Sequence, residues 1–327
     1  MLTDFIQETD VRKKLNELFP KPKLVKPDFA FPSSIPYNAR LLGNAIEYYI
    51  HLKYDFLNKT GDNHTIINEL IENFFPLIGN HFNNYKNPYR CFLKHMHNYH
   101  WFTTVKYYID GKFETNEYSF KNDGKTDRIN LMDIFLGVVG AFDELKKFHK
   151  NGKETNKFIE SILILAKILP GFRMHSMGNE PLNVSRNDKI TFQRLIKLLP
   201  KNLFKKRKDF KRYPAIGYGY ILGRPDFLID NELLEIKTSK DFFCRSDFNQ
   251  VLMYYLIYKM QRKMYKRQGV MIEKVSILYP LYKSKIELNL NEVINRKNYS
   301  AFLKFFETKK NSFDHLFPKN SRLRENN

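Results

Sequence analysis

Two carboxylates and a lysine, Asp226, Glu235 and Lys237, stand at spacings that could serve metal-dependent chemistry on a phosphate. Carboxylate oxygens are hard ligands and suit a hard cation such as Mg²⁺ or Mn²⁺. A cation held there would polarise a phosphate group and lower the pKa of a bound water. A neighbouring ammonium group would orient that water or offset negative charge in the transition state.

The three side chains converge if their segment forms a β-hairpin. Asp230 and Asn231 are favourable turn residues between two apolar, strand-prone runs, so a two-residue loop is the simplest connection. That register places Asp226 opposite Glu235, with Cβ atoms about 5 Å apart on one face. Alternation along the strand brings Lys237 to the same face, and the opposite face receives Phe227, Leu234 and Ile236. The competing interpretation is an ordinary hairpin whose solvent-exposed face carries alternating charges.

Several motifs together resemble the PD-(D/E)XK nuclease superfamily. The Pro-Asp pair at 225–226, followed by Glu-Ile-Lys at 235–237, resembles its active-site motif. Gln250 and Tyr254 form the Q-x-x-x-Y pattern of RecB-like members, and a spacing of four places them on one helix face. In that family these residues lie beside the active site and help position the metal-bound acid and the nucleic acid. Upstream, the segment 43–47 is similar to the family's first-helix motif, whose acid completes the metal site.

The resemblance implies a fold, an activity and a set of site residues. The fold is an α/β restriction-endonuclease-like core, a mixed central sheet flanked by helices, with a large helical insertion. The activity is exonuclease-like hydrolysis of phosphodiester bonds in DNA, with Mg²⁺ or Mn²⁺ as cofactor. The catalytic residues are Asp226, Glu235, Lys237, Gln250 and Tyr254. The metal ligands are Glu47, Asp226, Glu235 and the carbonyl of Ile236.

Two other functions stay open for this sequence. One is a non-catalytic nucleic-acid-binding subunit of a larger repair or defence complex. The other is a structure-specific endonuclease, in which the helical insertion reads the substrate. RNA stays open beside DNA as the nucleic acid.

The cysteine content separates the chain from one branch of the family. Many RecB-like nucleases carry four cysteines for an iron–sulfur cluster, whereas this chain has only Cys91 and Cys244. Two cysteines also make a disulfide framework unworkable and fit a reducing cytoplasm. No Walker phosphate-binding loop is present in the sequence. A motor activity would therefore have to come from a helicase or another protein partner on a separate chain.

The net charge points to a polyanionic partner. Fifty-five basic residues against 35 acidic ones leave +20, which attracts nucleic acid first and anionic membrane second. Excess lysine that only maintains solubility is the alternative. A basic cluster precedes the hairpin, where phosphate contacts would add sequence-independent affinity, although a solvated charge run is the default interpretation. The residues predicted to bind nucleic acid are Lys205, Lys206, Arg207, Lys208, Lys211, Arg212 and Arg224.

Four regions are expected along the chain. Residues 1–37 form an N-terminal arm, 38–55 with 190–300 the nuclease core, 56–189 the helical insertion and 301–327 a C-terminal tail. Helical periodicity is seen over 38–54, 65–75, 88–104, 129–150 and 156–169. The core is expected to contain three strands in sequence, then a helix and a further strand. Their expected ranges are 216–222, 225–229 and 233–238, then 247–267 and 275–279.

The remaining features carry less information. The spacing of Cys91, His95, His97 and His100 fits no standard zinc site, and a helix face rich in tyrosine and histidine is the better explanation. Tyr37, Tyr218 and Tyr220 are candidates for base stacking or for ordinary packing. No apolar run approaches 18 residues, and the first residues lack the basic and apolar order of a signal peptide. A cytoplasmic protein without a membrane partner is expected.

Overall fold

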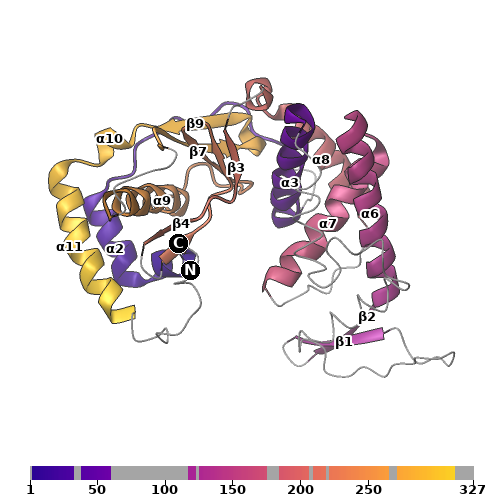
Figure 1. The fold of residues 1–327 in the computed structure, drawn as a ribbon, viewed down its shortest axis with the longest axis horizontal. Coiled ribbons are helices and arrows are strands. Elements are labelled where there is room, and N and C mark those ends of the chain that lie inside the picture. The colour runs from indigo at the N-terminus through magenta and orange to yellow at the C-terminus, as the bar shows by residue number, and fades with distance from the viewer. Residues whose placement is uncertain are drawn as a thin grey trace. The chain divides into compact units, whose positions relative to one another are not determined.

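The computed structural model describes residues 2–32, 38–59, 117–122, 125–174, 184–205, 209–218, 221–264 and 271–313. The chain groups into two compact units, the first made of residues 1–31 with 207–327 and the second of residues 32–206 (Figure 1). Residues 38–55, which the sequence predicts to be part of the nuclease core, lie in the second unit, together with the predicted helical insertion. Their functional assignment stays a prediction.

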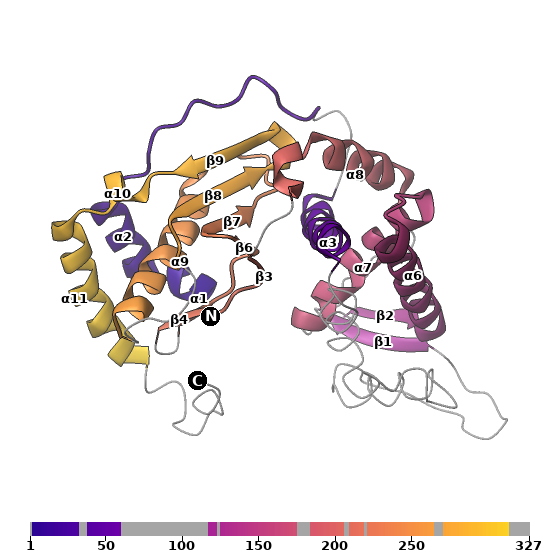
Figure 2. The ribbon, with the colours of Figure 1, turned by 45° about the horizontal axis from the view of Figure 1, so that its top comes forward.

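The first unit is built on a mixed five-stranded sheet in the order β3-β6-β7-β8-β9. Its strands are β3 (Phe210–Arg212), β6 (Phe227–Ile229), β7 (Glu232–Ile236), β8 (Lys274–Tyr279) and β9 (Ser284–Leu288). Only β7 and β8 pair in parallel, and the other neighbours are antiparallel. A parallel pair needs a crossover connection, which is α9 (Arg245–Met264). The expected α/β class, with a mixed central sheet flanked by helices, is confirmed (Figure 2).

The two parallel strands are apolar because both faces of the sheet are covered at this point. Leu233 and Leu234 of β7 are fully buried, as are Val275 and Ile277 of β8. Strands buried on both faces have nearly continuous apolar runs instead of alternating ones. The charged side chain of Glu235 within such a run is therefore an exception that needs a local explanation.

The predicted hairpin register is confirmed. Ile229 pairs with Glu232 and Phe227 with Leu234 across a two-residue turn. Asp230 in that turn has a φ of 52°, the left-handed conformation that the favoured hairpin turns require.

The predicted three-strand meander is wrong in its first strand. The run 216–222 contains two short strands, β4 (Ile216–Tyr218) and β5 (Ile221–Gly223), which pair with each other. These two strands form a sheet of their own, separate from the five-stranded sheet. The neighbour of β6 is instead β3, which lies in the basic stretch. Phe210 holds β3 in place by packing on Phe227, with ring centroids 5.6 Å apart.

Helices from both ends of the chain complete the first unit. Near the N-terminus α1 (Leu2–Gln7) contacts β5 and α9, and α2 (Thr9–Leu18) contacts α11 (Arg296–Phe313). Two phenylalanines four residues apart, Phe302 and Phe306, are fully buried on α11. Their rings meet Phe19 and Phe5 edge to face. Residues 301–313 of the expected tail therefore belong to a packed helix, and the short elements η4 (Pro280–Tyr282) and α10 (Leu290–Val293) lie between β8 and α11.

In its described residues the second unit is mainly helical. It contains α3 (Ala39–Asn58), α6 (Leu131–Asn151), α7 (Asn156–Met174), α8 (Arg186–Leu198) and η3 (Lys201–Phe204). Helix α3 contacts all four of the others, and its apolar face is buried against them. The helices expected over 38–54, 129–150 and 156–169 are confirmed, whereas those expected over 65–75 and 88–104 lie outside the described residues.

A small antiparallel sheet interrupts the expected helical insertion. It consists of β1 (Glu117–Asn122) and β2 (Lys125–Asn130). Aromatic and polar residues alternate along β1, which favours a strand over a helix. Among the described residues of both units, no helix has the length and hydropathy needed to cross a lipid bilayer.

Candidate active site

The predicted acidic pair lies at the carboxyl end of β7. Glu235 is on that strand, and Asp226 immediately precedes β6. The backbone N–H of Ile236 donates to Oδ2 of Asp226 at 2.7 Å, and the N–H of Asp226 donates to Oε2 of Glu235 at 3.3 Å. These two bonds place Asp226 opposite Glu235, one position beyond the last ladder pair, as the two-residue turn predicts.

Lys237 connects the hairpin to helix α9. Its Nζ donates to Oε1 of Glu235 at 3.0 Å and to Oε1 of Gln250 at 2.8 Å. Its backbone N–H donates to the carbonyl of Leu278 at 2.9 Å, which anchors it to β8. Only 19% of the Lys237 side chain and 5% of the Glu235 side chain are exposed. The ammonium is therefore fixed by oxygen acceptors from two different elements.

The electrostatic environment keeps Lys237 charged. Burial on its own would lower the pKa of this lysine, because it disfavours the charged form. The neighbouring carboxylates of Glu235 and Asp226 act in the opposite direction and outweigh burial. The net result is a pKa above the ordinary value for lysine, so the ammonium form dominates at neutral pH.

Gln250 and Tyr254 extend the cluster along one face of α9. The Gln250 amide nitrogen donates to Oε1 of Glu235 at 2.9 Å and to the Tyr254 hydroxyl oxygen at 3.0 Å. The Tyr254 hydroxyl in turn donates to the carbonyl of Arg224 at 3.3 Å. Gln250 therefore presents its oxygen to the ammonium and its nitrogen to the carboxylate. The structure brings together all five residues predicted as catalytic.

Gly223 allows the close approach of Tyr254 to the hairpin. A Cβ atom at Gly223 would lie 2.6 Å from the Tyr254 ring and 2.7 Å from the side chain of Leu2. Both distances are far below van der Waals contact, so any larger residue would displace the ring or the chain. This glycine therefore allows the chain to pass close to the ring just before Arg224, whose carbonyl Tyr254 binds, and Leu2 of helix α1 packs against the same point.

The oxygen ligands that this site offers are of the type that a hard cation prefers. Asp226 and Glu235 supply carboxylate oxygens, and the ammonium of Lys237 is 3.0 Å from Oε1 of Glu235. Mg²⁺ is commonly bound by only one or two carboxylates together with waters and substrate phosphates. Nowhere in the described part of the chain do three His, Cys, Asp or Glu side chains gather as a ready metal cage. The pair therefore suits an ion that completes its shell with water and phosphate.

Glu47, the predicted third acid, belongs to the second unit. It lies on α3, where its side chain is 14% exposed and its Oε1 is 4.0 Å from Nε2 of His51. Asp55 is buried further along the same helix. Glu47 is thus part of a polar stripe on α3, and its role as a metal ligand stays a prediction.

The predicted nucleic-acid contacts fall in different places. Lys211 and Arg212 lie on β3, where Arg212 pairs with Phe227, the residue after Asp226. Arg224 is exposed in the loop that leads to Asp226. Lys205 is exposed after η3 in the second unit, and three of the set lie outside the described residues, namely Lys206, Arg207 and Lys208.

The other sequence candidates contribute less. The hydroxyl of Tyr218 donates to Oε1 of Glu307 at 2.7 Å, and its ring packs on Phe306 with centroids 5.8 Å apart. That environment supports the packing interpretation of Tyr218 over base stacking. Tyr37, Tyr220, Cys91, His95, His97 and His100 lie outside the described residues.

Sequence reasoning missed one acidic residue near the cluster, Asp247. It is buried in the first turn of α9, and the hydroxyl of Tyr279 donates to its Oδ2 at 2.6 Å. Its carboxylate also contributes to the raised pKa of Lys237. The available signal was its spacing, because a residue three positions before Gln250 shares that residue's helix face.

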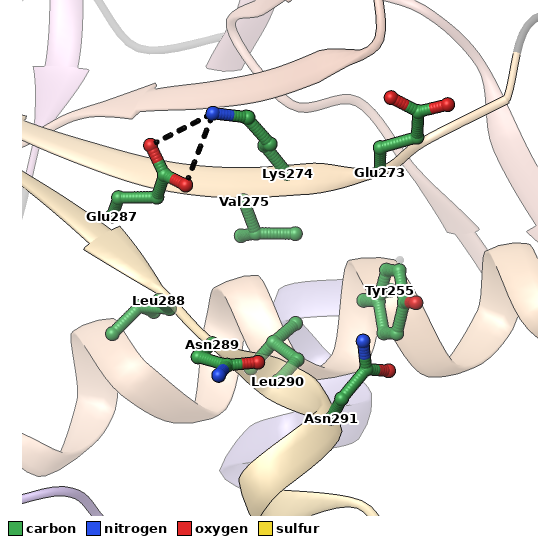
Figure 3. Close-up of a pocket in the computed structure, with 9 residues that line it drawn as sticks. All are labelled: Tyr255, Glu273, Lys274, Val275, Glu287, Leu288, Asn289, Leu290 and Asn291. Carbon is green, nitrogen blue, oxygen red and sulfur yellow. Dashed lines mark hydrogen bonds and ion pairs between the residues drawn. The ribbon is translucent and has the colours of Figure 1, made fainter.

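A pocket of about 250 Å³ lies away from this cluster, at the amino end of β8 (Figure 3). It is lined by Tyr255, Glu273, Lys274, Val275, Glu287, Leu288, Asn289, Leu290 and Asn291. Lys274 pairs with Glu232 in the sheet, whereas Leu278 pairs with Ile236. The pocket and the cluster therefore lie at opposite ends of the two parallel strands.

Comparison of the chain with protein-family models, with curated proteins and with solved structures found no match in any of the three.

Proposed function

We propose that this chain is a Mg²⁺-dependent nuclease of the PD-(D/E)XK kind, RecB-like in its motifs, that hydrolyses phosphodiester bonds in DNA with exonuclease-like action. The observation that carries the proposal is the hydrogen-bonded cluster of Asp226, Glu235, Lys237, Gln250 and Tyr254 at the carboxyl end of β7. Five residues selected from two separate sequence motifs meet in one place.

The topology supports the same proposal. A hairpin, a crossover helix and a parallel strand follow one another in β6, β7, α9 and β8. Ligand sites in sheets with parallel strands are commonly found beyond the carboxyl ends of those strands. The hairpin motif and the helix motif both reach that end, because α9 begins shortly after β7 ends. This is the order expected of a restriction-endonuclease-like core, with residues 56–189 as its helical insertion.

The side chains have complementary tasks in this proposal. Asp226 and Glu235, with the carbonyl of Ile236, would hold Mg²⁺ or Mn²⁺. The bound cation would supply polarisation of the phosphate and a lowered pKa for its water. Lys237 remains an ammonium, so it can orient the attacking water and offset negative charge as it develops. Gln250 holds the side chains of Glu235 and Lys237 in place relative to each other, because its amide group forms a hydrogen bond with each of them.

Basic residues of the first unit would hold the nucleic acid. Lys211, Arg212 and Arg224 lie on β3 and on the loop before Asp226, next to the proposed metal ligands. Phosphate contacts of this kind are sequence-independent and weaken as salt concentration rises. The formal charge of +20 favours the same partner. A helicase or other protein on a separate chain would supply any unwinding.

The test is a cleavage assay on linear duplex, closed circular duplex and single-stranded DNA, with RNA in parallel. Each substrate is incubated with Mg²⁺, with Mn²⁺ and with EDTA. We expect degradation of linear DNA with either metal and none with EDTA. Asp226→Asn should abolish cleavage, because it removes a charged ligand from the metal site. Glu273→Gln serves as the control, since Glu273 is exposed beside the pocket at the far end of the sheet.

Other outcomes would select another function. Nicking of closed circles would indicate an endonuclease. Salt-sensitive binding of every substrate, without metal-dependent cleavage of any, would indicate the non-catalytic binding subunit. Full cleavage by Asp226→Asn would rule out the proposed active site.

A further inference from the structure

Asp247 is a buried carboxylate outside the motifs that define the proposed active site. It is 6% exposed, and Tyr279, its hydrogen-bond donor, is fully buried. A buried carboxylate is unfavourable unless nearby groups compensate its charge. The first turn of α9 provides part of that compensation, because the amino end of a helix favours negative charge. The hydroxyl of Tyr279 provides another part.

The ammonium of Lys237 is a further source of compensation. Asp247 shares a helix face with Gln250, whose Oε1 accepts a hydrogen bond from the ammonium of Lys237. On the strand side, the backbone N–H of Lys237 binds the carbonyl of Leu278, the residue before Tyr279. Asp247 and Lys237 are thus brought together by α9 and by β8. The Asp247 charge accordingly adds to those of Glu235 and Asp226 in stabilising the ammonium.

Tyr279 is suited to hold Asp247 in one orientation. Burial and the adjacent carboxylate raise its pKa, so the hydroxyl remains a hydrogen-bond donor at all ordinary pH values. The ring is confined by Phe242 and Tyr282, with centroid distances of 5.0 Å and 6.3 Å. A fixed donor on a confined ring gives the carboxylate a defined position.

We propose that Asp247, held by Tyr279, is a positioning residue that keeps the ammonium of Lys237 in place while Glu235 serves the metal. This inference rests on the proposed nuclease function. Oε1 of Glu235 accepts hydrogen bonds from both Lys237 and Gln250. A cation bound by Glu235 would compete with the ammonium for that carboxylate. Asp247 has no part in the predicted metal site, so it continues to attract Lys237 when Glu235 is engaged.

Asp247→Asn removes the charge and retains an oxygen that can accept the hydrogen bond of Tyr279. We expect kcat on linear duplex DNA to fall about tenfold, the effect of about 1.4 kcal/mol in the barrier. KM for DNA and the midpoint of the Mg²⁺ dependence should change less than about twofold, because Asp247 is outside the proposed set of metal ligands and nucleic-acid contacts. Asp241→Asn is the matched control, since Asp241 is an exposed carboxylate six residues earlier.

Tyr279→Phe provides a second variant, which keeps the charge of Asp247 and removes its hydrogen bond. A smaller fall in kcat, about threefold, is expected because the carboxylate is no longer held in one orientation. If Asp247→Asn does not fold, this variant decides the outcome, and an unchanged kcat would overturn the proposal.

A readout without metal is the ¹⁵N-lysine NMR spectrum of the protein in EDTA. The ammonium of Lys237 is held by several acceptors, so its N–H signal should be visible in the unmodified chain and be identified by its loss in Lys237→Arg. Asp247→Asn should broaden or remove that signal, and Asp241→Asn should leave it unchanged.

The results distinguish the two proposals. Cleavage that survives Asp226→Asn removes the nuclease assignment and this inference with it. Cleavage that is lost in Asp226→Asn but unchanged in Asp247→Asn, together with an unchanged ammonium signal, overturns the role of Asp247 alone.

Discussion

The two ends of the parallel strand pair each carry a lysine–glutamate ion pair, in very different settings. At the carboxyl end of β7, Lys237 and Glu235 are 3.0 Å apart with 19% and 5% of their side chains exposed. At the amino end of β8, Lys274 and Glu287 are 3.2 Å apart with 55% of each side chain exposed. The separations are nearly equal, so burial and the surrounding partners account for the difference between the two pairs.

The buried pair is embedded in a network, whereas the exposed pair is solvated. Glu235 and Lys237 both bind Gln250, and Asp226 and Asp247 add their charges nearby. An exposed ion pair contributes little to stability, because water and salt compete with it. A buried pair is costly to desolvate and depends on every one of its partners. Such an arrangement is expected where a fixed charge serves a function.

Among the variants that test this comparison, Lys237→Ala is expected to have the largest effect. It leaves Glu235 buried without its ammonium, and breaking a buried pair typically costs about 3–5 kcal/mol of unfolding free energy. Cleavage should fall by about a thousandfold or more, as with the loss of other transition-state charge donors. Urea denaturation in EDTA measures the stability change, and initial rates on linear DNA measure the loss of activity.

The double variant Glu235→Gln with Lys237→Met sharpens that test. Removing both charges together should recover part of the stability lost in Lys237→Ala, because Glu235 no longer leaves a buried charge without its ammonium, whereas Asp226 and Asp247 keep their charges. It should recover no cleavage. Equal destabilisation in the single and double variants would show that the pair acts through packing instead of charge.

Local features of the sequence were sufficient for much of the site. The turn at Asp230 determines the strand register, and that register places Asp226 opposite Glu235. Both features depend on residues that are close in sequence. The spacing of Gln250 and Tyr254 determined their shared helix face for the same reason. These are the relations that strand alternation and helical periodicity encode directly.

Contacts between segments far apart in the chain could not be predicted from the sequence. The three-residue strand β3 has no alternation to separate it from a charged run, and it exists because it pairs with β6. The bond from Tyr279 to Asp247 joins residues 32 positions apart and depends on how α9 packs on β8. The fit of Gly223 against Tyr254 likewise depends on packing. Propensity and spacing carry no information on such contacts.

A moderate effect is expected from Gly223→Ala. The added methyl group would meet the Tyr254 ring and Leu2, and overpacking of this kind costs about 1–3 kcal/mol. Cleavage should also fall, because Tyr254 would move away from Gln250 and the Arg224 carbonyl. Thermal denaturation and initial rates measure the two effects.

Gly140→Ala is the matched control for that variant. Gly140 lies on α6, and a Cβ atom there would meet nothing within 4 Å. Alanine in an exposed helix position is more favourable than glycine by about 0.5–1 kcal/mol. The same substitution should therefore stabilise one position and destabilise the other. Destabilisation of both would mean that the packing around Gly223 is not the cause.

The smallest effect is expected from Lys274→Ala, which removes the exposed pair at the far end of the sheet. Its loss should change the unfolding free energy by less than about 1 kcal/mol, and the difference should shrink further in high salt. Cleavage should be unchanged, because Lys274 lies four residue positions along β8 from Leu278, the residue that anchors Lys237. Urea denaturation at low and high salt, with initial rates alongside, provides the measurement. The two lysines lie at nearly the same distance from their glutamates and differ chiefly in solvent exposure and partners. If Lys274→Ala lost as much stability or cleavage as Lys237→Ala, burial would not be the reason why the two ion pairs differ in importance.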